Sequence, residues 1–216
     1  MRLNRKGRAV GAMLACGFLS TLLYAIIDVV GALNWPGYDP RSQAISELSA
    51  IGAPTAELLA PLQTLYNVLL ALFGAGVWLT TADRAKLRWS GGFIIALAAL
   101  GIGWALFPMN LRGEQRGFSD TMHLVMGALS LVLIVSAIVA GAAALGRRFR
   151  LYSAATLLVM LCFGYLTGLD VPRVEAELPT PWLGVNERIM MASWLLWMAM
   201  LSVSLLRQAP IRHEAR

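Results

Sequence analysis

The sequence predicts an all-α integral membrane protein, a polytopic bundle of six transmembrane helices with a short interfacial helix in the first outer loop. Hydrophobic residues make up 58% of the 216 residues and charged residues only 14%, which is unlike a soluble domain. Six apolar runs approach the length of about 20 residues that crosses the hydrocarbon core. Basic residues gather at both ends and in alternate connections, as they do in proteins oriented across a membrane.

The six predicted spans use most of the chain, so residues 1–216 are expected to form a single membrane domain. The spans cover residues 9–33, 57–80, 91–107, 121–145, 151–169 and 189–206. The first span follows a basic start and resembles a signal peptide. It is much longer than the roughly 7 to 15 residues of a signal h-region, and no small-residue cleavage site closes it. We therefore expect a retained first helix.

The distribution of charge predicts the orientation. Of the 18 Lys and Arg residues, 13 lie on the side that holds both termini and 5 on the other side. The positive-inside rule therefore places both termini in the cytoplasm. The net charge of +6 is explained by this flanking pattern rather than by nucleic-acid binding. Most acidic residues then lie outside, where the longer and more varied connections are the expected place of any local site.

Aromatic and proline residues mark the ends of the spans. Trp35, Tyr38 and Trp182 lie at the expected outer edge, where such side chains usually anchor a protein at the membrane interface. A proline follows each odd-numbered span, at Pro36, Pro108 and Pro172. This pattern is typical of helix ends and predicts three outward-facing hairpins.

The first outer loop predicts a short surface helix. Asp39 can cap a helix whose first position is Pro40. Ile45, Leu48 and Ile51 would then form an apolar stripe. The polar side of the helix would carry Ser42, Gln43, Ser46, Glu47 and Ser49. Two interpretations stay open: the helix only closes the bundle, or it is a lid or binding element.

Asp28 lies within the first span, one turn beyond Tyr24. Ionisable residues inside spans are costly and usually face the bundle or a water-filled cavity. Asp28 is therefore a candidate site residue that should face protein or water. The alternative is a carboxyl group that only bonds a neighbouring hydroxyl or reaches the outer interface.

His123 and Asp120 form a candidate catalytic pair. They are three residues apart at the start of the fourth span, so they share a helix face. A carboxylate that orients an imidazole is the arrangement of a general base. Ser119 and Asp120 are also ordinary residues for a helix start, so the pair alone does not establish catalysis.

Glu187 and Arg188 precede the sixth predicted span, after Asn186, which can cap the helix. A helix cap with a surface ion pair explains both residues, although Arg188 fits this explanation less well because it sits where a helix enters lipid. The ligand-binding residues of the predicted outer site are Asp28, Asp39, Arg41, Glu47, Glu187 and Arg188.

The sequence marks no metal or cofactor site. Zinc needs three or four protein ligands, and the acids near the single candidate histidine show no spacing typical of a metal site. Cys16 and Cys162 lie in apolar runs, where cysteine behaves as a small hydrophobic residue. The cofactor and the oligomeric state do not follow from the sequence.

Three groups of residues, spread over nearly the whole chain, resemble those of a known family. They are Pro36-Gly37-Tyr38-Asp39-Pro40 with Gln43, Ile45-Ser46-Glu47-Leu48 and Gly52-Ala53-Pro54; Phe107-Pro108 with His123; and Gly184 with Glu187-Arg188-Ile189. With them the chain resembles the prokaryotic membrane-protein family catalogued as domain of unknown function 998. This resemblance implies a six-helix or similar bundle in a bacterial inner (plasma) membrane, and no settled activity. An acid often follows the Phe-Pro pair in that family, whereas this chain has Met109-Asn110, which puts a proton-transfer or metal role there in doubt.

Three classes of function fit these residues. A binding or sensory protein would hold a small polar or amphipathic ligand, such as a lipid headgroup, at the outer mouth of the bundle. A membrane-embedded enzyme acting at the outer leaflet would use His123 and Asp120 as general base. A proton-coupled transporter would use Asp28 as carrier. No inverted repeat marks a transporter and no nucleophile motif marks an enzyme, so the first class is favoured.

Overall fold

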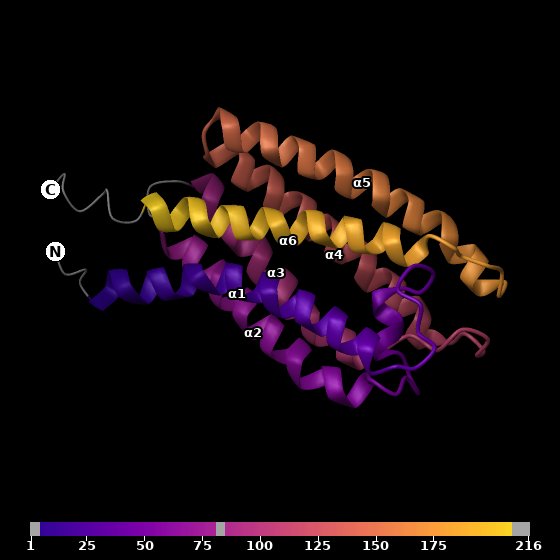
Figure 1. The fold of residues 1–216 in the computed structure, drawn as a ribbon. Coiled ribbons are helices and arrows are strands. Elements are labelled where there is room, and N and C mark those ends of the chain that lie inside the picture. The colour runs from indigo at the N-terminus through magenta and orange to yellow at the C-terminus, as the bar shows by residue number, and fades with distance from the viewer. Residues whose placement is uncertain (1–4, 81–84, 209–216) are drawn as a thin grey trace, which may run out of the picture.

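The computed structural model describes residues 5–80 and 85–208, which form six long α-helices (Figure 1). The helices are α1 (Arg5–Leu33), α2 (Ala56–Thr80), α3 (Ala85–Leu106), α4 (Phe118–Ala144), α5 (Arg147–Glu175) and α6 (Leu183–Gln208). A short 3-10 helix, η1 (Ile45–Ser49), lies between α1 and α2. Each of the six α-helices is long and apolar enough to cross a membrane. The predicted all-α bundle of six spans is confirmed.

Three helices run six residues past one end of their predicted spans. The sequence places the starts of α3 and α6 at residues 91 and 189, but they begin at Ala85 and Leu183. Helical structure continues past the apolar run because a helix satisfies its own backbone hydrogen bonds wherever it lies. The expected end of α5 at residue 169 is also wrong, because α5 continues through Pro172 to Glu175. A proline so close to a helix end removes a single backbone hydrogen bond.

The helices pack mainly against their neighbours in the sequence. Helix α1 contacts α2, α2 contacts α3 and α3 contacts α4, while α6 lies between α5 and α1 and closes the bundle (Figure 1). Small residues permit the closest approach: a Cβ atom on Gly91 of α3 would lie 2.7 Å from the carbonyl oxygen of Gly74 of α2. Helices α4 and α5 touch much less. The last two helices thus join the others mainly through α6.

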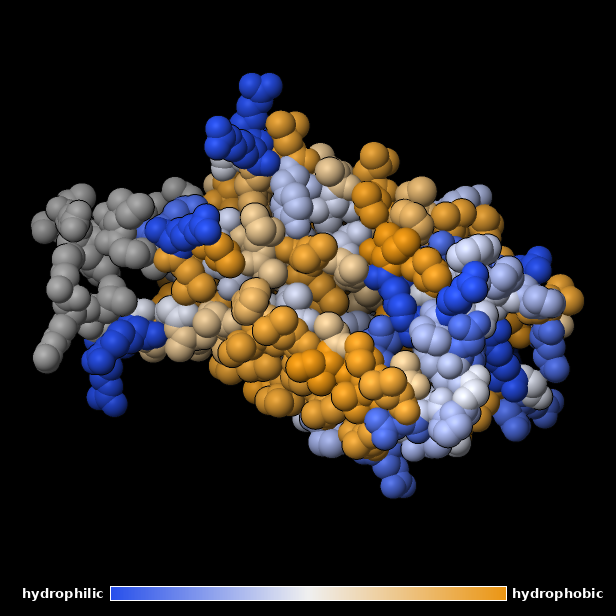
Figure 2. All heavy atoms as spheres, viewed as in Figure 1, coloured by the Kyte–Doolittle hydropathy of each residue, from blue (hydrophilic) through white to orange (hydrophobic). Residues whose placement is uncertain are grey.

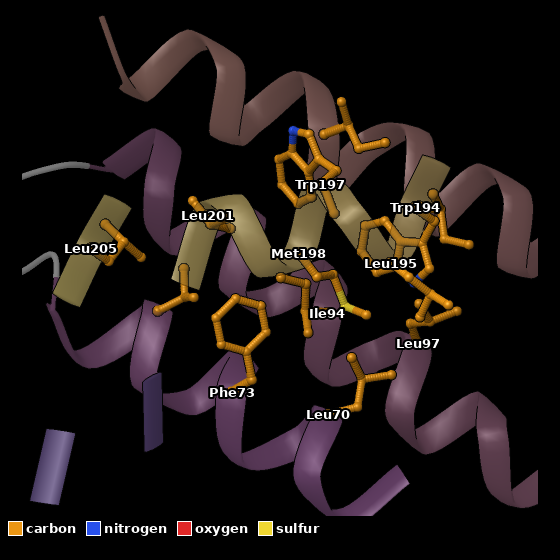
Figure 3. Close-up of a cluster of buried hydrophobic side chains, with 14 of the residues drawn as sticks. Leu70, Phe73, Ile94, Leu97, Trp194, Leu195, Trp197, Met198, Leu201 and Leu205 are labelled. Atoms are coloured by element: carbon orange, nitrogen blue, oxygen red, sulfur yellow. The ribbon is translucent and has the colours of Figure 1, made fainter. Parts of the chain in front are cut away.

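Helix α6 supplies the centre of the core. Trp194, Trp197 and Met198 are almost completely buried, and they belong to the same buried cluster as Phe73 of α2 and Ile94 of α3 (Figure 3). The two tryptophan rings stack with their centroids 5.6 Å apart. The indole N–H of a buried tryptophan needs an acceptor. Because these buried side chains lie on α6, this helix is the element around which the bundle is built.

The outer surface of the bundle carries an apolar band. Large hydrophobic side chains cover its middle, and hydrophilic residues gather at the two ends (Figure 2). Leu158 is 73% exposed and Ile102 67% exposed. Water would disfavour such a surface, whereas lipid tails accommodate it. The chain is a multi-pass membrane protein. We call the end that holds the connections α1–α2, α3–α4 and α5–α6 the outer end, and the opposite end the inner end.

Residues 34–55, which we call the outer cap, form the connection between α1 and α2. The prediction that a helix starts at Pro40 is wrong. Asp39 and Pro40 form a turn, and the 3-10 helix begins at Ile45. Asp39 accepts hydrogen bonds within that turn from the N–H of Arg41 at 3.0 Å and from the hydroxyl of Ser42 at 2.6 Å. These local bonds favour a turn over a helix.

The faces of the short helix also differ from the prediction. Ile45 and Leu48 are buried as expected, but Ile51 is half exposed. Its N–H donates instead to the carbonyl oxygen of Met109, which ties the outer cap to the α3–α4 connection. Glu47, expected on the polar surface, is only 1% exposed.

Candidate functional site

The outer end contains partly buried charges that connect the outer cap to the bundle. Arg188 of α6 contacts Asp28 of α1 through two hydrogen bonds, from Nε to Oδ2 at 3.0 Å and from Nη2 to Oδ1 at 2.7 Å. Both side chains are 21% exposed. Asp28 thus faces protein, and a bidentate pair is the geometry in which Arg binds a carboxylate most strongly.

The remaining donors of Arg188 bind the outer cap and α6 itself. Nη2 donates to the hydroxyl oxygen of Tyr38 at 2.8 Å, and Nη1 donates to the carbonyl oxygen of Pro40 at 2.7 Å. Nη1 also lies 3.2 Å from the carbonyl oxygens of Gln43 and Gly184. All five N–H groups of the guanidinium therefore have acceptors. Arg188, predicted as a ligand-binding residue, is fully engaged within the protein.

Glu187 fixes the start of the short helix. Its Oε2 atom accepts a hydrogen bond of 2.6 Å from the N–H of Ile45. The first N–H groups of a helix have no acceptor within the helix, so a carboxylate at this place stabilises it. Adjacent residues of α6 thus hold two different parts of the outer cap.

Arg112, from the α3–α4 connection, holds the other side of the outer cap. Its Nε and Nη2 atoms donate to the two carboxylate oxygens of Glu47 at 2.9 and 2.7 Å. Nη1 donates to the hydroxyl of Thr180 at 2.7 Å, and Nη2 also donates to the carbonyl oxygen of Ser42 at 2.8 Å. Thr180 precedes α6, so Arg112 joins three outer connections at one point.

Glu47 is the acceptor at the centre of this second cluster. Besides Arg112 it binds the N–H of Ala44 at 2.8 Å and the side-chain amide of Gln43 at 3.1 Å. A buried carboxylate is tolerated when it is paired and hydrogen-bonded in this way. Glu47 was predicted as a ligand-binding residue, whereas Arg112 was only one of the five basic residues expected on the outer side. The one feature of the sequence that could have singled out Arg112 was its position on the side of the membrane that has few basic residues.

Tyr38 links the two clusters. Its hydroxyl donates to the carbonyl oxygen of Ala44 at 2.9 Å and accepts from Arg188. Burial raises the pKa of Tyr38 to about 12, so the phenol stays neutral at physiological pH. Tyr38 was predicted to anchor the protein at the membrane interface. Its buried position shows that it is a polar partner within the outer cap.

Asp120 and His123 are near each other but have separate partners. The carboxylate of Asp120 accepts from the backbone N–H of Asn110 at 2.8 Å, from its side-chain amide at 2.6 Å and from the N–H of Gly117 at 2.9 Å. His123 places Nδ1 3.1 Å from the carbonyl oxygen of Phe107. Its ring meets the ring of Trp104 edge-on, with centroids 4.5 Å apart.

The spacing of the two residues predicted that Asp120 orients the imidazole of His123. The described residues do not form this arrangement. The start of α4 and the preceding connection present backbone N–H groups that need acceptors, and Asp120 satisfies them. The carbonyl of Phe107 holds His123 in place of the carboxylate. A general-base role for His123 stays a prediction.

Asp39 and Arg41 lie at the surface of the outer cap. Hydrogen bonds from the Ser42 hydroxyl and the Arg41 N–H keep the pKa of Asp39 below its ordinary value. The guanidinium of Arg41 lies over the ring of Trp182, 5.0 Å from its centroid. A cation held on an interfacial aromatic ring is well placed to meet the headgroup region of a membrane.

A small pocket of about 40 Å³ opens between the α3–α4 connection and the end of α5. Its lining consists of Met109, Asn110, Leu111, Arg112, Gly113, Glu114, Arg116, Asp120, Val174, Glu175 and Glu177. Arg116 is paired with Glu175 at 2.8 Å. Glu114 and Glu177 are exposed and enter no ion pair within residues 5–80 and 85–208.

No group of three His, Cys, Asp or Glu side chains in the described ranges could hold a metal ion. The structure brings Asp28 and Arg188 together, joins Glu47 to Arg112, places Glu187 beneath the short helix and leaves Asp39 and Arg41 at the surface. The predicted site residues thus share one end of the bundle but not one cavity.

Comparison with curated proteins gives no match, and comparison with solved structures gives none either. A family model described as "Protein of unknown function (DUF998)" matches residues 18–204, which include all of α2 to α5, parts of α1 and α6, and both arginine clusters of the outer end. The match extends over most of the chain and agrees with the motifs of the outer cap, Phe107-Pro108 and Glu187-Arg188. The protein therefore belongs to the DUF998 family.

Proposed function

We propose that this protein is a membrane-embedded binding protein that takes the positively charged head of a small polar or amphipathic ligand at its outer end. The observation that carries the proposal is the charge of the outer pocket. Its two arginines are engaged by Glu47 and Glu175, whereas two of its carboxylates, Glu114 and Glu177, have no cationic partner among the described residues. A cationic group complements such a pocket.

The size and position of the pocket support a headgroup rather than a whole lipid. A volume of about 40 Å³ holds a few waters or one ammonium group, and it is far below the roughly 300 Å³ or more of an ordinary ligand pocket. The lining of the pocket includes Val174 and Glu175 at the end of α5, a helix long and apolar enough to cross a membrane. The tail of an amphipathic ligand can therefore stay in lipid while its head enters the pocket.

The geometry gives less support to the other two classes of function. The proposed carrier, Asp28, is fixed by two hydrogen bonds from Arg188, whose own donors are all engaged. A transporter carboxylate has to change partners during its cycle. Asp120 is likewise engaged by backbone and side-chain amides away from His123. Binding requires neither residue to move.

Lipid titration tests the proposal. Purified protein in mild detergent would be titrated by calorimetry with short-chain phosphatidylethanolamine, short-chain phosphatidylglycerol and free ethanolamine. We expect the ethanolamine lipid to bind and the glycerol lipid to bind at least about tenfold more weakly, because a charge-assisted hydrogen bond contributes about 1.5 to 3 kcal/mol. Binding of free ethanolamine as tightly as the lipid would identify a soluble amine as the ligand.

Variants locate the site. Glu114→Gln together with Glu177→Gln should weaken ethanolamine-lipid binding about tenfold or more, since both unpaired carboxylates are neutralised. Glu57→Gln is the control, because Glu57 is an exposed acid at the start of α2 that does not line the pocket. Equal affinity of the double variant and the unmodified protein, or no binding of either amine, would contradict the proposed function.

A further inference from the structure

A second concave site lies at the inner end, between α4 and α5. The groove there has a volume of about 420 Å³. Its walls consist of Val139, Ala142 and Ala143 on α4 and Ser153, Ala154 and Leu157 on α5. The remaining lining residues are basic: Lys86 at the start of α3 and Arg150 in the first turn of α5. This site is separate from the outer pocket, which lies at the other end of the same helices.

The groove follows from the way α5 is held. Helix α5 packs chiefly on α6, where the hydroxyl of Ser153 accepts a hydrogen bond of 2.9 Å from the indole of Trp197. Toward α4 it presents small side chains such as Ala154, opposite Ala142 and Ala143. These side chains are too short to fill the space between the two helices. In a bilayer, an apolar groove that faces the lipid is filled by hydrocarbon, because an empty one would lose dispersion contacts.

The charge at the rim is positive, and neither cation has an acidic partner among the described residues. Neither Lys86 nor Arg150 takes part in any of the four ion pairs formed within residues 5–80 and 85–208. The acidic residues of these ranges all lie toward the outer end of the helices or in the outer connections. Two cations beside an apolar groove match the phosphate and the acyl chain of an anionic phospholipid.

We propose that the groove between α4 and α5 binds an anionic phospholipid of the inner leaflet. Its phosphate contacts Lys86 and Arg150, and an acyl chain lies along Val139 and Leu157. The volume of the groove falls within the range of about 300 to 1,000 Å³ that is usual for ligand sites. The bound lipid takes the place of the helix contact that α4 and α5 lack.

Native mass spectrometry tests this proposal. Protein released from mild detergent would be incubated with phosphatidylglycerol or phosphatidylcholine of identical acyl chains. We expect phosphatidylglycerol to bind at least about tenfold more tightly, since two cations near a membrane surface contribute about 1 kcal/mol each. Lys86→Gln with Arg150→Gln should remove this preference. Arg148→Gln is the matched control, because Arg148 is in the same turn of α5 but does not line the groove.

A second variant tests the acyl site without changing any charge. Ala154→Leu places a larger apolar side chain in the groove and should reduce the binding of both lipids. Lipid binding can also be compared by whether added phosphatidylglycerol raises the Tm, because a ligand that binds only the folded state stabilises it. Equal binding of the two lipids, or a preference for phosphatidylglycerol that survives the double substitution, would overturn the proposal.

Discussion

Among single residues, Arg188 and Arg112 have the largest structural consequences. Each binds a carboxylate through two hydrogen bonds and also backbone carbonyls of the outer cap. Taking such charges out of water is costly, and their attraction offsets the cost only when the partners stay in place. Removing one partner should therefore lower the stability of the protein far more than the loss of an exposed ion pair would.

Substitution of Arg188 provides a direct measurement. Arg188→Ala leaves Asp28 without its partner near the membrane interface, so we expect the free energy of unfolding to fall by about 3 to 5 kcal/mol. Asp28→Leu should also destabilise, because it leaves the guanidinium unpaired. Thermal or denaturant unfolding in detergent measures both effects.

The matched control is the exposed pair of Arg116 and Glu175, whose side chains are 33% and 45% exposed. Arg116→Ala should cost less than about 1 kcal/mol. Equal effects of Arg188→Ala and Arg116→Ala would show that the ion pair of Arg188 with Asp28 is no more important than a surface one. A gain in stability from Asp28→Leu would show that Asp28 lowers the stability of the folded protein.

At the scale of elements, hydrophobic runs predict the six helices because lipid leaves the backbone no other way to satisfy its hydrogen bonds. The outer cap is different. Its turn at Asp39 and its 3-10 helix depend on partners supplied from elsewhere: Glu187 for the N–H of Ile45, and Arg112 for Glu47. These partners are 142 and 65 residues away in the sequence. A single sequence contains no pattern that announces such distant pairs, so the candidate residues could be selected but not their contacts.

Gly184 shows how closely the outer cap lies on α6. A Cβ atom at this position would overlap the carbonyl oxygens of Pro40 and Gln43, both of which accept from Arg188. Gly184→Ala should therefore displace the outer cap while the six helices stay formed. We expect faster cleavage of residues 34–55 by an added protease and a lower Tm.

Gly168→Ala is the control for this prediction, because a Cβ atom at Gly168 of α5 would meet nothing within 4 Å. It should leave both the cleavage rate and the Tm unchanged. An outer cap that resists protease equally in both variants would show that contact with Gly184 is not needed to hold it.

At the scale of the whole molecule, charge divides the bundle into two ends. Both helix ends near the termini lie together at the inner end (Figure 1), and the described ion pairs lie at the opposite end. The positive-inside rule predicts that this inner end is cytoplasmic. Both proposed sites depend on this orientation for the leaflet that they face.

Cysteine labelling in intact cells tests the orientation. With Cys16 and Cys162 replaced, single cysteines at Arg41, Glu114 or Glu177 should react with an impermeant thiol reagent. Cysteines at Lys86 or Arg148 should react only after the cells are opened. The reverse pattern of labelling would show that the orientation is inverted.

The pair of Asp28 and Arg188 also has a consequence for biosynthesis. The two residues are 160 positions apart, on the first and the last helix. When the ribosome has produced α1, its carboxylate has no guanidinium to meet until five more helices have been made. A nascent chain that lacks α6 thus carries an unmatched charge and an outer cap without its anchor. The pair of Asp28 and Arg188 can therefore form only after α6 is in place, so it belongs to the last stage in the assembly of these six helices.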